Sequence, residues 1–411
     1  MIIRNLPIIA LIFSGFFAQF AGVGVIATAI SKLTLINTDA AFPSFIVIVN
    51  TMGVSFTGIF LGRFLTRYQG FTLGFYCQFV SVIITFLLAF ANEDYVVLLL
   101  VFLLAVLMGF DNPNNNSCLN KLSFEQKNSI SQTFSQYTTT IQIALVTSPI
   151  VTAFLIIYCG HKYAFLCLMF FYILASLPWL YNKKLRSLTS NTTDVKALSR
   201  IQGYKIIYQN KALRDLTVAR VLNNLLFAGI MVLMPVIIAR SSSQNNQFTI
   251  IQSICMFAMS AGFIANGFIT KILLKKNVGL LPVFAKLATF LALCGIIFAI
   301  ILNFKPYALY VMATIMGWAQ FYLRLGSMSL GQAVTPKKYF AEAILAGDTI
   351  IRIFVTIYSI SLLYLVGYFK SFMPFCIFCA ISALAPHFLK RSQKIYNLSL
   401  IHISEPTRPE R

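Results

Sequence analysis

The chain has 411 residues, of which 58% are hydrophobic and only 10% are charged, and its formal net charge is +21. Soluble domains are about 45–50% apolar and about 25% charged, so this composition excludes an ordinary soluble protein and indicates one that crosses a membrane repeatedly. The positive charge alone would also fit a nucleic-acid-binding protein. Its distribution along the chain decides between the two.

Apolar segments of about 20 residues, each long enough to cross a bilayer, recur along the chain. The pattern predicts an all-α membrane protein with twelve transmembrane helices. The first segment is longer than the apolar core of a signal peptide, so we interpret it as the first span. We place the spans at residues 6–30, 43–62, 71–91, 95–118, 130–157, 163–181, 216–239, 248–270, 279–302, 306–331, 341–366 and 371–389.

Lysine and arginine concentrate in every second connection between these spans. The largest group lies in residues 182–213, whereas the opposite connections carry single residues such as Lys32 and Lys162. This bias follows the positive-inside rule. It predicts a protein of the cytoplasmic (inner) membrane with both termini cytoplasmic, and it attributes the basic charge to topology and not to nucleic-acid binding.

One long polar connection divides the chain. We predict an N-terminal six-helix bundle at residues 1–181, a cytoplasmic linker at 182–213 and a C-terminal six-helix bundle at 214–397. A degraded repeat favours two related halves, because the stretch 58–67 is matched by 262–271 about half the chain later. Residues 398–411 resemble a translated sequencing adapter, so we exclude them from functional argument.

The stretch from Gly62 to Gly70, which reads Gly-Arg-Phe-Leu-Thr-Arg-Tyr-Gln-Gly, resembles the loop signature of the major facilitator superfamily. That signature reads roughly Gly-x-Leu-small-Asp-Arg-x-Gly-Arg. Gly62 and Arg67 match it, Thr66 stands in place of the aspartate, and Lys271 ends the second copy. The resemblance implies two six-helix halves that rock about a central site, with Gly62, Arg67 and Lys271 in the gating loops.

The fifth predicted span carries a second resemblance. Exporters of this superfamily often have several glycines around a proline there; in this chain Pro149 is kept and small residues such as Ser148 replace the glycines. Small residues let helices pack closely, and the proline removes one backbone hydrogen bond. Together with the polar run that begins at Asp111, the motif is similar to the macrolide-efflux and siderophore-exporter branches and favours export.

Polar side chains inside the spans are the strongest functional signal, because a charge at mid-bilayer costs about 2.5–3.5 kcal/mol on insertion scales. They fall into stripes with helical spacing. The resemblance implies that the first, fourth, seventh and tenth spans line a central cavity, and three of these carry such stripes. The candidate cavity residues, which include two from the fifth span, are Asn112, Asn115, Gln132, Gln136, Arg220, Asn223, Asn224, Gln320 and Arg324.

Asp111 is the candidate proton-coupling residue, because a carboxyl group buried away from water can take up and release a proton near neutral pH. The alternative is a structural carboxylate held by the neighbouring asparagines. Arg220 and Arg324 would suit an anionic substrate, with ion pairing to an aspartate as the alternative. Asp348 and Arg352 lie four residues apart and are predicted to form a structural ion pair.

The sequence therefore predicts a secondary transporter, and proton-coupled efflux of a small organic molecule such as a drug or siderophore is the preferred function. Uptake of a small metabolite and a non-transporting receptor or scaffold are the alternatives. No His-Glu-x-x-His, Gly-x-Ser-x-Gly or P-loop motif occurs, and the cysteines lack zinc-type spacing. We therefore expect no enzyme activity, metal or other cofactor. We expect a monomer whose partners are its substrate, the proton and the lipid bilayer.

Overall fold

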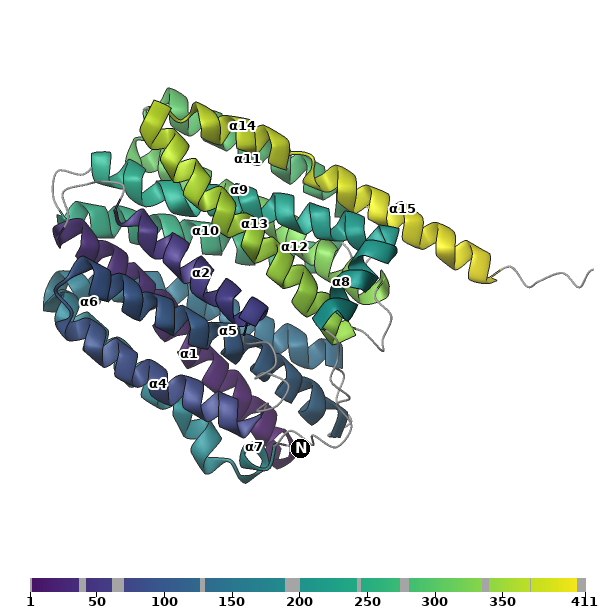
Figure 1. The fold of residues 1–411 in the computed structure, drawn as a ribbon, viewed down its shortest axis with the longest axis horizontal. Helices are drawn as coiled ribbons and strands as arrows, with labels where there is room; N and C mark the ends of the chain where they lie inside the picture. Colours follow the sequence, from purple (N-terminus) through teal and green to yellow (C-terminus); the bar gives the residue numbers. More distant parts are fainter. Residues whose placement is uncertain are drawn as a thin grey trace, which may run out of the picture. The chain divides into compact units, whose positions relative to one another are not determined.

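The structure is a computed structural model, and it describes residues 2–36, 42–60, 70–125, 130–188, 200–241, 245–273, 281–334, 340–369 and 371–404. Every regular element in these ranges is an α-helix (Figure 1), which confirms the predicted all-α class. In chain order the elements are α1 (Ile2–Ile36), α2 (Ser44–Phe60), α4 (Phe71–Phe90), α5 (Asp94–Glu125), α6 (Ile130–Tyr181), α7 (Lys183–Arg186), α8 (Arg200–Gln209), α9 (Lys211–Ser241), α10 (Asn245–Leu273), α11 (Leu281–Ile301), α12 (Pro306–Val334), α13 (Phe340–Phe369), α14 (Met373–Ser382) and α15 (Ala385–Ser404).

Most helices agree with the apolar segments of the sequence, but the predicted span 371–389 is divided between α14 and α15. Among the described residues, eight helical stretches are long and apolar enough to cross a membrane, and two shorter apolar helices lie at Ser44–Phe60 and Ala285–Ile301. The protein is therefore a multi-pass membrane protein.

One of these stretches, Thr139–Tyr181, has 43 residues. A continuous helix of that length would extend about 65 Å, roughly twice the hydrocarbon thickness of a bilayer. The helix is interrupted at Gly160, whose φ of 80° and ψ of 167° are not helical. Glycine adopts positive φ without the steric cost that a Cβ atom brings. The break lies between the predicted spans 130–157 and 163–181.

The described residues group into two compact units. Unit 1 comprises Met1–Lys196, Met231–Ala261 and Phe304–Pro306, and unit 2 comprises Ala197–Ile230, Gly262–Asn303 and Tyr307–Arg411. The break between Lys196 and Ala197 falls within the predicted linker at 182–213, and the second part of α9 and the first part of α10 are grouped with unit 1.

Unit 1 is built around α1, α4, α5 and α6, which pack against one another and run side by side in Figure 1. Trp179 is fully buried in its core, and the indole Nε1 donates a hydrogen bond to Ser14 Oγ at 3.0 Å. A Cβ atom on Gly74 of α4 would lie 2.3 Å from the Trp179 ring. Glycine at this position therefore lets α4 approach α6 closely, and this approach positions the polar residues of α4.

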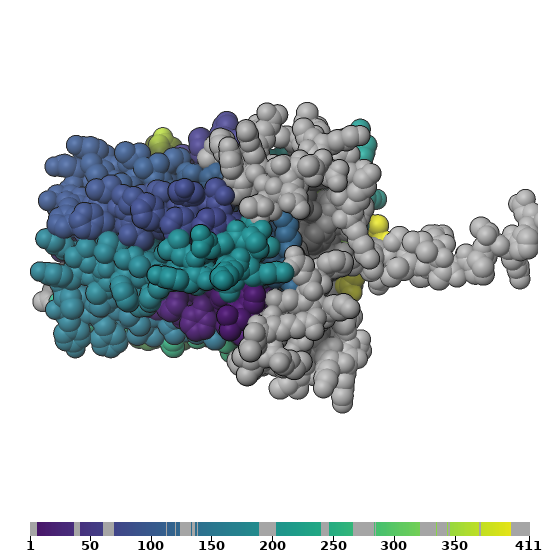
Figure 2. Space-filling view, turned by 90° about the horizontal axis from the view of Figure 1, so that it is seen from below, coloured from purple at the N-terminus to yellow at the C-terminus, as the bar shows by residue number. Residues whose placement is uncertain are grey.

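Figure 2 shows α4 and α6 in blue and teal at the surface, and many of their exposed side chains are large and hydrophobic. A surface with many exposed large hydrophobic side chains favours contact with lipid over contact with water. On these two helices they include Tyr76, Phe79, Ile83, Phe86, Phe90, Phe154, Tyr158, Tyr163 and Phe170.

Candidate functional site

Asp111 lies on the polar stretch of α5 and is buried inside unit 1, with 9% of its surface exposed. Gln78 of α4 donates a hydrogen bond from Nε2 to Asp111 Oδ1 at 2.7 Å, and Asn115 donates from Nδ2 to Asp111 Oδ2 at 3.1 Å. Each carboxylate oxygen therefore accepts one hydrogen bond from a neutral amide. No described lysine or arginine forms an ion pair with Asp111.

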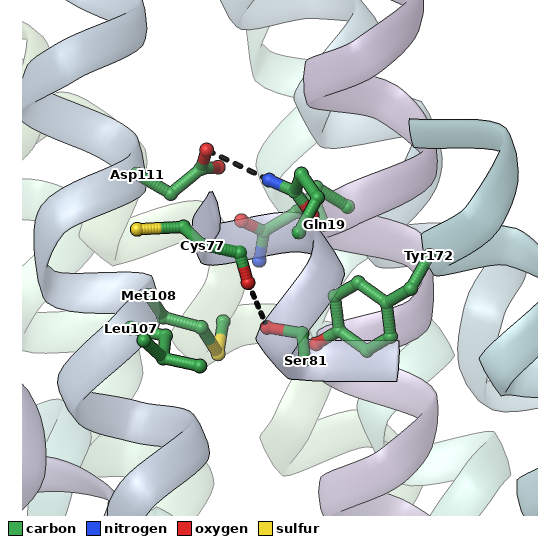
Figure 3. Close-up of a pocket in the computed structure, with 9 residues that line it drawn as sticks. Gln19, Cys77, Ser81, Leu107, Met108, Asp111 and Tyr172 are labelled. Carbon is green, nitrogen blue, oxygen red and sulfur yellow. Dashed lines mark hydrogen bonds between the residues drawn. The ribbon is translucent and has the colours of Figure 1, made fainter. Parts of the chain in front are cut away.

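A small cavity adjoins Asp111 (Figure 3), and it is lined from α1, α4, α5 and α6. Its volume of about 10 Å³ leaves room for roughly one water molecule. Two lining groups, Gln78 Oε1 and the Tyr172 hydroxyl, are buried and have no hydrogen-bond partner within the described part of the chain. Buried polar atoms without a partner commonly mark a bound water or a group that changes its bonding during function. The other lining residues are Ala18, Gln19, Cys77, Ser81, Leu107 and Met108.

Asn114, three residues after Asp111, fixes the start of α4. Its Nδ2 donates to the Gly70 carbonyl at 3.0 Å, and its Oδ1 accepts from the Gly70 amide at 2.6 Å. Gly70 has a φ of 100°, and a Cβ atom there would lie 1.8 Å from the Leu188 carbonyl oxygen. The polar run of α5 therefore binds α4 at two points along its length. Asn114 contacts Gly70 at the start of α4, and Asp111 contacts Gln78 further along the helix.

Unit 2 contains a second ionic group. Arg220 of α9 forms an ion pair from Nη2 to Asp348 Oδ1 of α13, 128 residues later in the chain. Asp348 was predicted to pair with Arg352, one turn further along α13. The structure corrects that prediction: the Arg220 guanidinium approaches from another helix, whereas Arg352 interacts with the charges of Asp348 and Arg220 without forming an ion pair among the described residues.

The other predicted cavity residues are dispersed. Asn115 contacts Asp111, Gln136 is exposed on α6, and Gln320 is half-buried on α12. In unit 2, Asn223 is buried and Asn224 donates to the Arg220 carbonyl at 2.7 Å. Outside the described residues or side chains lie Gly62, Arg67, Asn112, Gln132, Lys271 and Arg324.

Ser148 and Pro149 are both buried on α6. The Ser148 hydroxyl donates a hydrogen bond to the Phe20 carbonyl of α1 at 2.6 Å. A serine inside a membrane helix can satisfy its hydroxyl in this way while keeping the two helices close.

Sequence reasoning missed a polar cluster near the end of α1. The Ser31 hydroxyl lies 2.7 Å from Thr249 Oγ1 and 3.0 Å from His161 Nε2. Lys32, assigned above to an outer connection, is instead buried on α1, and its ammonium donates to the carbonyls of Leu88 and Ala91. The last carbonyls of a helix lack donors within that helix, which explains why the end of α4 attracts a lysine. Residue spacing gave no signal for these contacts, because they join distant segments.

No group of three His, Cys, Asp or Glu side chains that could hold a metal ion occurs among the residues described in these ranges. The described part of the molecule offers a buried carboxylate with amide partners in unit 1, and two arginine–aspartate pairs, Arg220–Asp348 and Arg391–Asp215, in unit 2.

An all-α chain with many membrane-spanning helices and ionic groups within them has the architecture of a membrane transporter. The chain belongs to the Major Facilitator Superfamily, whose model matches residues 11–355, well over half of the sequence. The family predicted from the loop motif is therefore confirmed. No curated protein matches the sequence.

Solved structures of transporters have the same fold. A POT family transporter in complex with a thioalcohol-conjugated peptide is 13% identical, with a TM-score of 0.75 over 95% of this chain and 96% of that chain. The nucleoside transporter NupG is 12% identical, with a TM-score of 0.68 over 94% of this chain and 100% of that chain. A bacterial homologue of the human lysosomal transporter Spinster is 13% identical, with a TM-score of 0.60 and 99% of both chains covered. At these identities the likeness establishes the fold alone, and this is a fold of secondary transporters.

Proposed function

We propose that the protein exports a small organic molecule, such as a drug or a siderophore, in exchange for protons. In this proposal the chain crosses the inner membrane twelve times with both termini in the cytoplasm, as two six-helix repeats that act as a monomer and expose a central site alternately to each side. The superfamily and the transporter fold support the general class. The small residues around Pro149 support export, because they resemble the motif of superfamily exporters.

One observation carries the proposed coupling: Asp111 is a buried carboxylate whose described partners are neutral amides. A carboxylate that faces an arginine is held in its charged form, whereas one held by amides can change its charge without leaving an unpaired cation behind. Asp111 is therefore the acid in unit 1 that is best suited to bind and release a proton.

Protonation of Asp111 would also change the packing between α4 and α5. Ionised, each of its oxygens accepts an amide hydrogen; protonated, one oxygen becomes a donor and needs an acceptor. Gln78 Oε1 has no hydrogen-bond partner among the described residues, so a rotation of the Gln78 amide would present it to the new O–H. The proton would then exchange one arrangement of the Gln78–Asp111 contact for another, as a coupled transporter requires.

Metabolite profiling of cells tests this proposal. Deletion of the gene is expected to raise the substrate inside the cells and lower it in the medium, and wild-type protein is expected to restore both. Asp111→Asn should behave like the deletion at normal membrane abundance, whereas Asp111→Glu should retain transport. A reversed sign of both concentration changes would indicate uptake, and unchanged profiles after deletion would contradict transport altogether.

The matched control replaces another acid inside a predicted span that the structure describes. Asp348 belongs to unit 2 and is already paired with Arg220, so it is not expected to carry the coupling proton. Transport by Asp348→Asn should keep its dependence on the pH gradient. The proposal would be refuted if transport by Asp348→Asn lost its dependence on the pH gradient while transport by Asp111→Asn kept it. That result would place the coupling residue in unit 2.

A further inference from the structure

We infer that Arg352, beside the Arg220–Asp348 ion pair, forms a binding site for a carboxylate or a similar anionic group of the transported molecule. The inference rests on the proposed transport function and names a substrate class for it. It uses only unit 2, in which Arg220, Asp348 and Arg352 all lie.

Arg220 forms an ion pair with Asp348, and two further contacts accompany it. Its own carbonyl accepts a hydrogen bond from Asn224 Nδ2 at 2.7 Å, which ties the two residues together along α9. A Cβ atom on Gly347 would lie 3.4 Å from Arg220 Nη1, so the guanidinium lies closely against the backbone of α13.

The charges of this group do not balance. Asp348 supplies one negative charge, and that charge is already paired with Arg220. Arg352 lies one helical turn from Asp348 and is attracted by it, but it is also repelled by Arg220. The described residues of the cluster therefore carry two guanidinium groups and one carboxylate, which leaves one positive charge.

An unbalanced cation inside a membrane span is costly, and such residues mark substrate or ion pathways more often than they serve packing alone. A guanidinium presents parallel N–H donors that match a carboxylate or phosphate with two hydrogen bonds. An anionic group on the substrate would neutralise the remaining charge. Arg352 is half-buried on α13.

The arrangement gives each residue a distinct role. Arg352 attracts the anion, Arg220 contributes positive potential, and Asp348 limits that potential by pairing with Arg220. Removing Arg352 should therefore weaken anion binding, whereas removing the charge of Asp348 should strengthen it. A purely structural ion cluster would not produce opposite effects from these two substitutions.

The experiment measures the thermal unfolding of the purified full-length protein in detergent, titrated with sodium benzoate at constant ionic strength. Benzamide, which has nearly the same shape and no charge, is the matched neutral probe. Benzoate should raise the unfolding temperature of the wild type in a saturable way, because a ligand that binds only the folded state stabilises it. Benzamide should not.

Arg352→Gln is expected to abolish the benzoate-dependent shift. Asp348→Asn is expected to lower the apparent dissociation constant by about tenfold, which corresponds to roughly 1.4 kcal/mol. Lys286→Gln removes an exposed lysine of α11 and should leave the shift unchanged.

An absent shift in the wild type, an unchanged shift in Arg352→Gln, or weaker binding by Asp348→Asn would each overturn the inference. Asp348→Asn keeps the test decisive if Arg352→Gln fails to fold. Because the measurement needs neither a membrane nor a pH gradient, its failure is distinguishable from a failure of proton-coupled export in cells.

Discussion

Two of the ionic groups that the structure describes, one around Asp111 and one around Asp348, use the same type of acid in different ways. In unit 1, Asp111 is buried and bonded to the neutral amides of Gln78 and Asn115. In unit 2, Asp348 is paired with Arg220 and lies one turn from Arg352. The first acid can be neutralised by a proton at little cost to its partners, whereas the second is needed in its charged form by an arginine.

This difference separates two tasks that a coupled transporter must perform. A coupling residue has to exist in two protonation states, so it needs partners that tolerate both. A site for an anionic substrate needs a lasting positive charge, which arginine supplies because it stays protonated. Partner chemistry therefore distinguishes the two tasks better than burial does.

The largest effect is expected when Asp111 is given an arginine partner like that of Asp348. Gln78→Arg places a guanidinium next to Asp111 and should hold the carboxylate in its ionised form. We expect transport driven by a pH gradient to fall by at least about a hundredfold, which corresponds to about 2.8 kcal/mol. The measurement is uptake into proteoliposomes, with and without the gradient, of the substrate identified by profiling.

The control for this variant is exchange of labelled against unlabelled substrate at equal pH, which does not need net proton movement. Exchange should persist in Gln78→Arg, and Gln78→Glu should lose less of the gradient-driven rate than Gln78→Arg. Full gradient-driven transport by Gln78→Arg would mean that Asp111 does not change its charge, and the contrast between the two acids would no longer hold.

The next effect concerns the frame that positions the first site. Asn114→Ala removes two hydrogen bonds to Gly70 and leaves buried backbone groups of Gly70 without these partners. We expect the free energy of unfolding of unit 1 to fall by about 2–3 kcal/mol. Because Asn114 fixes the start of α4, gradient-driven transport should fall as well. The ion pair between Asp348 and Arg220 in unit 2 should not change.

The unfolding of each unit can be followed separately, because one of the two tryptophans lies in each: Trp179 in unit 1 and Trp318 in unit 2. A Trp318→Phe background reports unit 1 in a denaturant titration, and Asn116→Ala, which removes an exposed asparagine of the same run, is the matched control. Equal stability of Asn114→Ala and Asn116→Ala would show that the polar run does not hold α4.

Hydropathy predicted most of the fold. The apolar segments located most helices, because a segment in lipid must satisfy its own backbone groups. The ends were predicted less well: α1 and α5 run several residues past the predicted spans, and the span 371–389 is divided between α14 and α15. The prediction placed two spans on either side of residue 160. The structure has a single element, α6, whose helix is broken at Gly160. The connection between the two spans is so short that nearly all of its residues keep helical hydrogen bonds. The unusual polar run after residue 110 also identified Asp111 as a residue with a special environment.

The partners of these residues could not be predicted, because they are set by helix packing and not by spacing. Gln78 lies in an apolar segment where nothing nearby indicates that it contacts Asp111. Helical spacing correctly brought Asp348 and Arg352 to neighbouring turns, but it could not show that Arg220, 128 residues away, forms the ion pair with Asp348. Lys32 was misassigned for the same reason: its acceptors are carbonyls at the end of another helix.

The smallest effect is expected from a double-mutant cycle on Arg220 and Asp348, and it tests whether the second acid is as firmly held as the contrast requires. Their side chains keep 25% and 41% of their surface exposed, so the coupling should be nearer to that of an exposed pair than of a buried one. We expect a coupling energy of about 1 kcal/mol from a cycle of Arg220→Gln, Asp348→Asn and the double variant, measured as unfolding of unit 2 in a Trp179→Phe background.

The sign of this coupling energy matters more than its size. Each single variant leaves one charge of the pair without its partner, so the double variant should be more stable than the two single losses predict when they are added. If the losses simply add, Asp348 does not depend on Arg220 for its charge, and Asp348 could then bind the proton as well as Asp111.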